Sequence, residues 1–416
     1  MAAESAADVL ADIDIGGWLL SVSQVASTTG RLRKQHILVS SFRLGIALAA
    51  ALVLAACSAR PEAGFLSPVS ETQLGAATHT ILVSTTRKRD DRAGTLFNGE
   101  RAERLDFARI AVSVPPNHEV GQIEWASTAP GDPKTNFVTR QASYLDGDKA
   151  FVQALNAQLA SLPKGKRRVF LFVHGYNTMF AEGLYRFAQV VHDSKMPAVP
   201  VLFTWASRGQ LAQYVYDNNS ATAARDDLER TIRLVFASDA DEVNLMAHSM
   251  GNWVTVEALR QIKMTGGLPQ TSKFGQLILA APDIDIDVFK AQMRRFGKPK
   301  KPFIIVLSKD DKALGLSNFL AGGQARLGAD ADAAELTELG ALVIDMTEVK
   351  ALDSSNHGKF AQLAVIAPQL QQALERGVAA QRSSAGADEI ARNSLEAIVK
   401  LPITVISAPL RAIAGR

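Results

Sequence analysis

Short, wholly apolar runs alternate with longer amphipathic segments through the middle of this chain. Residues 169–173 read Val-Phe-Leu-Phe-Val and residues 303–307 read Phe-Ile-Ile-Val-Leu, with no polar position on either face. Strands that are apolar on both faces belong to parallel sheets covered by helices on each side. The pattern therefore predicts an α/β fold with a mostly parallel, doubly wound sheet of about eight strands.

The expected elements follow from these runs and from the 3.6-residue periodicity between them. The predicted strands are residues 80–85, 107–114, 168–173, 199–204, 242–247, 276–280, 302–307 and 341–345. The predicted helices are residues 148–162, 181–195, 223–236, 252–264, 285–296, 314–320 and 359–375. Only one helix fits between strands 276–280 and 302–307, so no large cap domain is expected there. The loop 207–221 should bound an open site, and the Gly- and Ala-rich stretch 322–332 is expected to be a surface loop.

The N-terminal region carries an export pattern. After Arg43 the chain is apolar from residue 44 to residue 56 and ends in Leu-Ala-Ala before Cys57. This run is shorter than the ~20 residues that a membrane-spanning helix needs, and a charged flank, an apolar run and small residues describe a secretory signal. The ending resembles the lipobox of bacterial lipoproteins, whose cysteine is diacylated and becomes the mature N-terminus. An uncleaved anchor or a buried helix is the alternative.

Cys57 is the only cysteine of the 416 residues, which excludes an internal disulfide and a cysteine-based metal site. We expect residues 1–56 to be a signal region with an over-long N-terminus, 57–77 a linker, 78–375 the folded domain, and 376–416 a linker with an apolar tail. Ser58 after the cysteine favours the periplasmic face of the outer membrane. The net charge of only +3, from 45 basic and 42 acidic residues, gives no footprint for nucleic acid.

The candidate chemistry centres on Ser249. It follows the buried strand 242–247 and precedes the helix 252–264, in the sequence Ala-His-Ser-Met-Gly. Strand, serine and helix in this order form the nucleophile elbow, where small residues on both sides let the backbones approach closely. Ala247 and Gly251 meet that demand. A serine that only caps a helix is the plainer alternative.

A serine nucleophile needs a base and an acid that orients the base. His357 is the only histidine after His248, and it lies in a polar loop beyond the last predicted strand. Asp310 and Asp311 follow the strand 302–307, where open α/β sheets place their sites. Asp311 is our choice because Leu314 can anchor its turn in the core, whereas Asp310 should be solvated.

Three further acids alternate at Asp283, Asp285 and Asp287, without an accompanying histidine or further acid cluster. We interpret them as the charge pattern of a helix N-terminus. Asp283 follows another strand and is expected to cap this helix, although some hydrolases place the orienting acid at its position.

The loop after strand 168–173 supplies the remaining candidates. An oxyanion hole needs two backbone N–H groups; we assign them to Met250 and Tyr176. His174, Gly175 and Trp205 are predicted to contribute to substrate binding, with His174 also expected to hold the loop. His118 and His192 are expected to be surface residues.

These segments together resemble a bacterial α/β-hydrolase family, catalogued as a domain of unknown function within the esterase/lipase superfamily. The resemblance rests on Phe-Val-His-Gly-Tyr-Asn at 172–177, Leu-Phe-Thr-Trp-Ala-Ser-Arg-Gly at 202–209, Ala-His-Ser-Met-Gly-Asn at 247–252 and Ala-Ala-Pro-Asp-Ile-Asp at 280–285. Thr-Thr-Arg at 85–87 and Val-Pro-Pro-Asn-His at 114–118 also fit, while Ala206 departs from the expected proline. The resemblance implies an α/β-hydrolase fold and a serine hydrolase over about residues 78–375, without a substrate.

The expected function is thus an exported, lipid-anchored serine hydrolase that cleaves an ester or related acyl bond through Ser249, His357 and Asp311. The expected partners are a small-molecule or lipid ester and, through lipidated Cys57, a membrane. No cofactor and no metal is required by this chemistry. A peptidase or thioesterase on the same machinery, or an envelope protein that uses the fold only to bind, remains open.

Overall fold

The computed structural model describes residues 60–61, 63–268, 270–297, 299 and 301–363, together with the backbone of residues 404–406. The expected signal region with Cys57, and the C-terminal tail apart from residues 404–406, lie outside these residues. The predicted helix 359–375 is described only to residue 363. In the part of the chain that is described, no helix has the length and apolar character to cross a bilayer.

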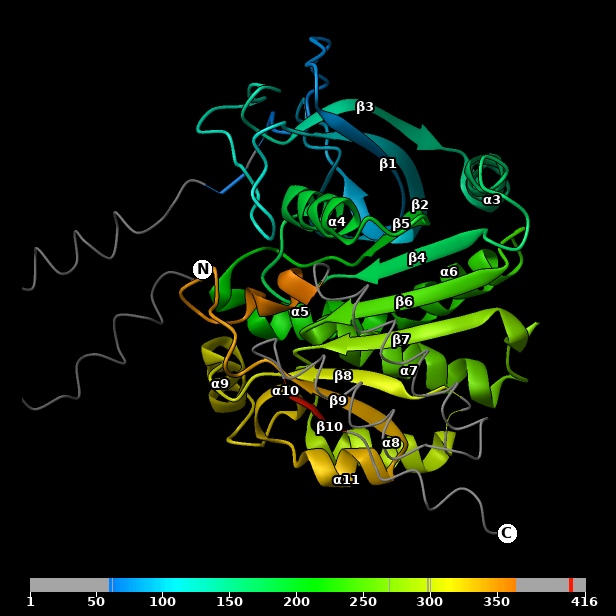
Figure 1. The fold of residues 1–416 in the computed structure, drawn as a ribbon, viewed down its shortest axis with the longest axis vertical. Helices are drawn as coiled ribbons and strands as arrows, with labels where there is room; N and C mark the ends of the chain where they lie inside the picture. Colours follow the sequence, from blue (N-terminus) through cyan, green and yellow to red (C-terminus); the bar gives the residue numbers. More distant parts are fainter. Residues whose placement is uncertain are drawn as a thin grey trace, which may run out of the picture. The chain divides into compact units, whose positions relative to one another are not determined.

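The described strands form one ten-stranded sheet in the order β10-β9-β8-β7-β6-β4-β5-β1-β2-β3 (Figure 1). The seven strands from β9 to β1 are parallel, whereas β10, β2 and β3 join the two edges antiparallel. Their bounds are β1 Ala77–Arg89, β2 Phe97–Val114, β3 Val138–Leu145, β4 Arg168–Val173, β5 Val199–Thr204, β6 Glu242–His248, β7 Phe274–Ala280, β8 Phe303–Leu307, β9 Ala341–Asp345 and β10 Thr404–Ile406. The mostly parallel, doubly wound architecture predicted from the apolar runs is confirmed.

Helices cover both faces of this sheet. Their bounds are α3 Gly147–Leu159, α4 Phe180–Ser194, α5 Tyr214–Ala223, α6 Arg225–Phe236, α7 Met250–Met264, α8 Ile286–Phe296, α9 Lys312–Leu320, α10 Leu327–Asp330 and α11 Ala333–Glu338, with 3-10 turns η2 Leu211–Gln213, η3 Thr271–Lys273 and η4 Gly358–Gln362. One core cluster joins the sheet to α3, α6, α7 and α8, and a second joins it to α4 and η4. The side chains at odd and even positions of each central strand therefore pack into two separate apolar cores, as expected for a sheet with helices on both faces.

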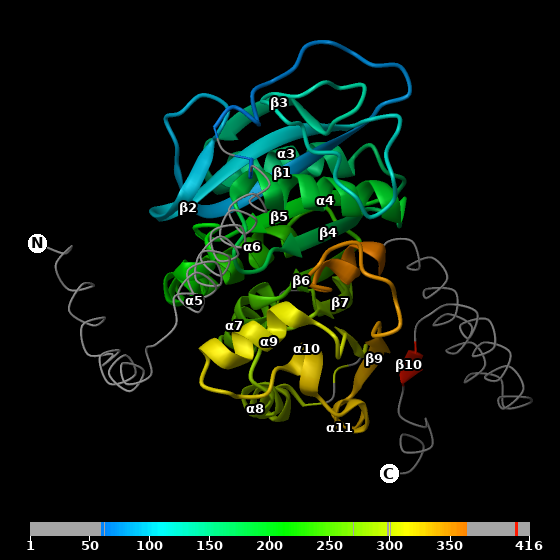
Figure 2. The ribbon, with the colours of Figure 1, turned by 90° about the vertical axis from the view of Figure 1, so that its left-hand side faces the viewer.

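The carboxyl ends of the parallel strands all meet one side of the sheet. Figure 2 looks onto this side and shows α5, α9 and the orange segment of η4 gathered around it. Loops and helix starts at these ends are where open α/β sheets place their sites.

Several expectations about the connections were wrong. The stretch 322–332 is not only a surface loop, because residues 327–330 form α10; Leu327 in this helix is fully buried, and Arg326, which precedes it, is nearly so. The bounding loop 207–221 is largely helical, since α5 begins at Tyr214. Strand β3 at the edge was missed. As expected, the described residues contain no insertion large enough for a cap domain.

Candidate active site

Ser249 lies in a strained turn between β6 and α7. Its backbone angles are φ 53° and ψ −127°, a region that residues with a Cβ rarely adopt. Gly251 packs so closely on the carbonyl oxygen of His174 that an added Cβ would collide with it. A Cβ built on Gly175 would lie 2.6 Å from the Cβ of Ser249. The β4–α4 loop therefore passes directly over the serine, and both glycines are needed for that approach.

The turn is fixed by hydrogen bonds to the neighbouring strand β7. The Ser249 N–H donates to the carbonyl oxygen of Ala280 at 3.0 Å, and the Ser249 carbonyl accepts from the N–H of Asp283 at 3.2 Å. The buried amide of Asn252 donates to the carbonyls of both Ser249 and Ala280, each at 2.9 Å. The serine is thus held by the core of the sheet.

His357 and Asp311 form a pair beside this turn. The His357 Nδ1 lies 2.7 Å from Asp311 Oδ2, with the aspartate side chain 1% exposed and the histidine 17% exposed. Asp311 is oriented in turn because its other oxygen caps α9, accepting from the N–H of Leu314 at 3.0 Å. The pairing expected between Asp311 and His357 is therefore present, and Leu314 is buried as its anchor.

The loop that carries His357 is held at both ends. Asp353 accepts from the N–H groups of Ser355, His357 and Gly358. Burial alone would raise the pKa of Asp353, but the hydroxyl of Ser355, which also donates to it, and these N–H groups outweigh burial and hold the pKa below its ordinary value. The carboxylate therefore stays ionised and keeps the loop closed around it.

Lys359 fastens the other end of that loop. Its buried ammonium group lies 2.7 Å from Asp310 and donates to the carbonyl oxygens of Met346 and Thr347. Asp310 is exposed to solvent, as expected, but it also pairs with Lys359 and accepts from Asn356 at 2.9 Å. Asp310 thus helps to fix the loop.

Asp283 does not cap α8, contrary to expectation. That role belongs to Asp285, which accepts from the N–H groups of Asp287 and Val288. Asp283 is buried and accepts from Ser317 Oγ at 2.6 Å, with Arg326 Nε at 3.3 Å. Burial raises the pKa of Asp283 despite the nearby arginine. Asp283 therefore pairs with Arg326. His357 bonds to Asp311, not to Asp283.

His174 and Trp205 hold the β4–α4 loop from below. His174 is 2% exposed and Trp205 is fully buried, and their rings stack at 5.0 Å. Trp205 Nε1 donates to the His174 carbonyl at 2.9 Å, and His174 Nε2 lies 2.8 Å from Thr204 Oγ1. The prediction that these two residues bind substrate does not fit, because neither side chain reaches solvent; they position Gly175.

The buried side chain of Arg87 also supports the β4–α4 loop. Arg87 donates to Thr204 Oγ1 and to the carbonyls of Ser207 and Thr178, each at 2.7 Å. Burial, followed by the charge of Arg87, lowers the pKa of His174 to about 3, so this histidine is neutral. Sequence reasoning quoted Arg87 as part of a motif and assigned it no role.

Asp217 binds the same loop from α5. It accepts from Ser207 Oγ at 2.5 Å and from the Asn177 N–H at 3.2 Å. The Thr178 N–H donates to Ser207 Oγ at 3.0 Å. Two N–H groups that follow Tyr176 are therefore already occupied. The Tyr176 hydroxyl donates to the Leu211 carbonyl and ties the loop to η2.

The ring of His248 packs against His357, the histidine that pairs with Asp311. Its ring lies 4.5 Å from that of His357 and 3.9 Å from that of Phe360, measured between centroids. Burial and the neighbouring His357 lower the pKa of His248 well below its ordinary value. His248 is therefore a neutral ring against which His357 packs, and it directly precedes Ser249 in the chain.

A match to a known protein family agrees with this architecture. Among solved structures, the crystal structure of esterase B from Lactobacillus Rhamnosis (HN001) is similar over 89% of this chain and 100% of its own, with 9% identity and a TM-score of 0.34, a likeness too distant to bear on function. No curated protein matches the chain. A family model described as "Alpha/beta hydrolase of unknown function (DUF900)" matches residues 148–375. The chain thus belongs to this family of α/β-hydrolases.

Proposed function

We propose that this hydrolase is a serine enzyme that cleaves an ester or a related acyl bond through an acyl-enzyme. The observation that carries the proposal is the Asp311–His357 pair at 2.7 Å beside the strained turn of Ser249. A nucleophile elbow, a histidine at the edge of the site and a buried acid that fixes its Nδ1 are the parts that this chemistry needs.

Each group has one role in the proposed reaction. His357 Nε2 removes the proton of Ser249 Oγ as the oxygen attacks the acyl carbon, and Asp311 stabilises the resulting imidazolium. The alcohol leaves with the proton from His357, and a water molecule then repeats the sequence to release the acid. Each tetrahedral intermediate carries an oxyanion, for which we propose the N–H groups of Met250 and Tyr176 as donors.

The surroundings of the site favour a substrate with an apolar part. Large apolar side chains are exposed on three elements near it: Leu211 on η2, Val215 on α5, and Leu316, Phe319 and Leu320 on α9. Tyr214 and Ser317 join these elements by a hydroxyl contact of 3.0 Å. Exposed apolar patches mark binding surfaces, so an acyl chain or lipid ester fits this rim better than a polar substrate does.

The proposal is tested by covalent labelling. The wild-type protein should react with a fluorophosphonate probe and turn over members of a panel of esters, thioesters and peptides. Ser249→Ala should lose the label and turnover by a factor on the order of 10⁴ or more with an unchanged fold, whereas Ser161→Ala, at an exposed position after α3, should keep both. Labelling that survives Ser249→Ala would assign the nucleophile elsewhere.

The same panel separates the alternatives. Preferred turnover of thioesters or peptides would change the substrate class while keeping the three residues. A protein with no labelling and no turnover, despite a native fold, would instead be a binding module that has kept the hydrolase architecture.

We further propose that the protein is exported and anchored by lipid at Cys57, on the periplasmic face of the outer membrane. The support is the apolar run and the lipobox-like ending in the sequence. Two acyl chains on one terminus give stable attachment where one chain does not. Cys57→Ala should abolish metabolic labelling with palmitate; undiminished labelling would refute the anchor.

A further inference from the structure

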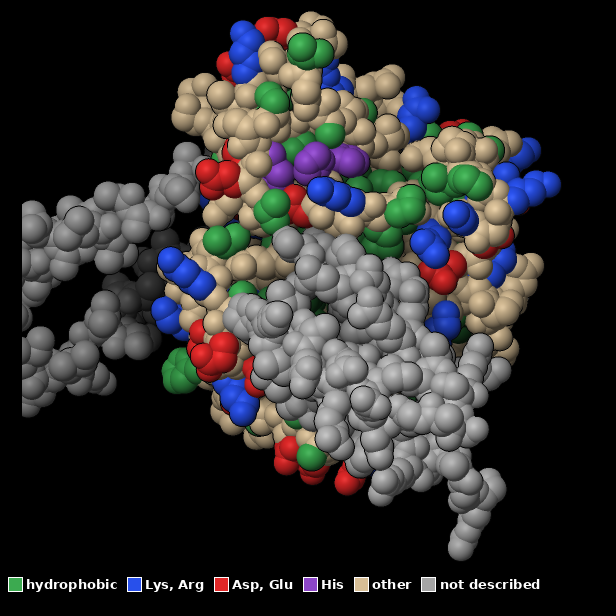
Figure 3. Space-filling model, in the orientation of Figure 1, with side chains coloured by type: hydrophobic (Ala, Val, Ile, Leu, Met, Phe, Trp, Pro, Cys, Tyr) green, Lys and Arg blue, Asp and Glu red, His purple; other side chains and the backbone are tan. Residues whose placement is uncertain are grey.

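A second group of histidines lies outside the candidate active site. His79 comes from β1, His118 from the loop after β2, and His192 from the last turn of α4. The ring of His192 lies 5.3 Å from that of His79 and 5.2 Å from that of His118, between centroids. Histidine side chains gather in this way on the face shown in Figure 3. His118 and His192, expected to be surface residues, are half-buried and pack against each other.

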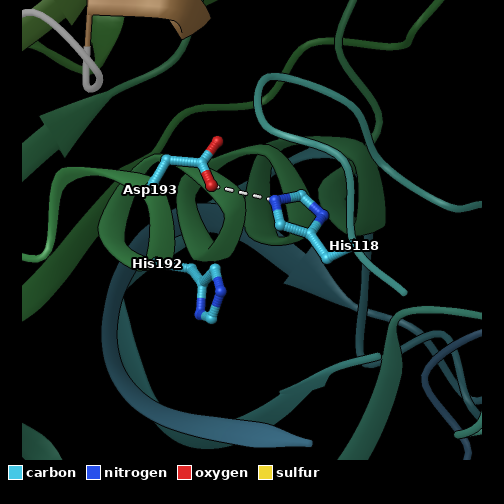
Figure 4. Close-up of side chains that lie close together, drawn as sticks. All are labelled: His118, His192 and Asp193. Carbon is cyan, nitrogen blue, oxygen red and sulfur yellow. Dashed lines mark hydrogen bonds and ion pairs between the residues drawn. The ribbon is translucent and has the colours of Figure 1, made fainter. Parts of the chain in front are cut away.

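Asp193 completes the cluster, as Figure 4 shows. One ring nitrogen each of His118 and His192 and one carboxylate oxygen of Asp193 all lie within 4.8 Å of one another. Among the described residues, this is the group whose ligand atoms come together as a metal ion would require. His118 Nε2 lies 2.9 Å from Asp193 Oδ1.

The opposite atoms of these side chains are held by other groups. His118 Nδ1 lies 2.8 Å from Glu124 Oε2. Asp193 Oδ2 accepts from the Gly121 N–H at 2.8 Å and from Gln189 Nε2 at 2.5 Å. Histidine ligands of metals commonly have their second nitrogen bound to a carboxylate, and carboxylate ligands are themselves hydrogen-bonded. His118 Nε2 and Asp193 Oδ1 therefore face each other, and the two side chains are already oriented by Glu124, Gly121 and Gln189.

His192 is suited to be the third ligand. Its Nδ1 lies 3.1 Å from His79 Nε2, so a neighbouring ring fixes its orientation. A surface hollow of about 520 Å³ is lined by His79 and His192, so this side of the cluster borders on solvent.

We propose that His118, His192 and Asp193 form a binding site for a divalent transition-metal cation of the Zn²⁺ class. Two imidazoles and one carboxylate suit this class, whereas Ca²⁺ and Mg²⁺ prefer oxygen ligands alone. Ligands at about 2.05 Å in tetrahedral geometry are roughly 3.3 Å apart, so the ion draws the three atoms inward by small side-chain rotations. Binding displaces the proton that His118 Nε2 donates to Asp193 and releases it to water.

The site is separate from the proposed hydrolase chemistry. The β4–α4 loop that covers Ser249 leads into the N-terminus of α4, while His192 and Asp193 lie in its last turn, about 18 Å along the helix at 1.5 Å per residue. The ion would join α4 to the β2–β3 connection that carries His118. Its expected role is to stabilise this junction, and metal binding rather than ester turnover is the readout.

The test uses the full-length, untagged protein in detergent, freed of metal with a chelator and dialysed. Titration with Zn²⁺ by calorimetry, and with Co²⁺ by visible absorption, should show one saturable equivalent. Co²⁺ should develop the intense bands of a tetrahedral site with nitrogen ligands. Because a proton is displaced, the affinity for Zn²⁺ should fall as the pH is lowered from 7.5 to 6.

Matched variants assign the ligands. His192→Ala, which removes the ring contacts with His79 and His118, and Asp193→Asn should each lower the affinity for Zn²⁺ at least tenfold. Lys195→Ala, a neighbouring change in the same hollow, should bind as the wild type does. Circular dichroism checks that each variant is folded. Absence of saturable binding by the wild type, or equal affinity in folded His192→Ala and Lys195→Ala, would overturn the proposal.

Discussion

Replacing Asp311 by asparagine tests the proposed mechanism most sharply, because the side chain makes two contacts that an amide cannot keep together. In the structure, one carboxylate oxygen accepts from the N–H of Leu314 and the other lies 2.7 Å from His357 Nδ1. An asparagine has one acceptor oxygen and one donor NH₂ group. Only one of the two contacts can therefore retain an acceptor.

The hydrogen bond that caps α9 determines which way the side-chain amide of Asn at position 311 is oriented. If its oxygen faced His357, the NH₂ group would meet the N–H of Leu314, donor against donor, and the cap, worth about 1 kcal/mol, would be lost. The oxygen should therefore stay on Leu314, and the NH₂ group should donate to His357 Nδ1. The histidine proton then moves to Nε2, which can no longer accept the proton of Ser249. Loss of this tautomer in a comparable triad costs a factor of about 10⁴ in kcat, or about 5.5 kcal/mol.

The measurements are kcat/KM on the best ester of the panel, the rate of fluorophosphonate labelling, and the melting temperature. Asp311→Asn should lower both rates by about 10⁴ with little change in melting temperature, because asparagine caps helices as well as aspartate does. Asp332→Asn is the matched control: Asp332 caps α11 through the N–H of Ala334, with no contact to His357. A rate loss below tenfold for folded Asp311→Asn would refute the assignment and turn attention to Asp283.

Three further outcomes follow from the supports of the site. Gly175→Ala should lower probe labelling by at least tenfold in a folded protein, because its Cβ would lie 2.6 Å from that of Ser249; an unaffected rate would show that the loop can move aside. Lys359→Met should lower the free energy of unfolding by about 2 kcal/mol, measured by urea denaturation, since Asp310 is partly exposed and keeps some hydration; a change near zero would mean that the ion pair contributes nothing. Burial alone would lower the pKa of His118, but its contacts with Asp193 and Glu124 raise it. With chelator present, the wild type should melt at a higher temperature than His118→Gln below about pH 6.5. This difference should disappear as the pH rises through the raised pKa of His118. A melting-temperature difference that grows with pH would contradict this.

The central architecture could be predicted, and the three residues proposed for the reaction could be selected, because their signals are local. Each parallel strand is an unbroken apolar run, and Ser249 sits between such a strand and a helix. Asp311 and His357 each follow a strand that ends on the same side of the sheet. Chain order and strand polarity alone therefore bring them together, without knowledge of any side-chain contact.

The supports could not be predicted because they depend on long-range packing. Arg87 and Ser207 meet across 120 positions of the chain, and His118 and Asp193 across 75. Arg326 lies in a stretch whose glycines and alanines are typical of surface loops, yet its side chain reaches the buried Asp283. Strand β3, with burial on an irregular subset of its positions, pairs only along the sheet edge and lacks the two-sided apolar run.

The hydrogen bonds around Ser249 have a consequence for engineering. Its N–H and carbonyl are both bound to the segment that ends β7, and Asn252 bridges the two carbonyls from α7. The position of the side chain is therefore set by main-chain atoms and by Asn252, and none of these contacts uses the hydroxyl. A different nucleophilic atom, such as the sulfur of a cysteine, would inherit the same place and direction. For the nucleophile that we propose, the geometry of attack and the identity of the attacking atom can therefore be varied separately.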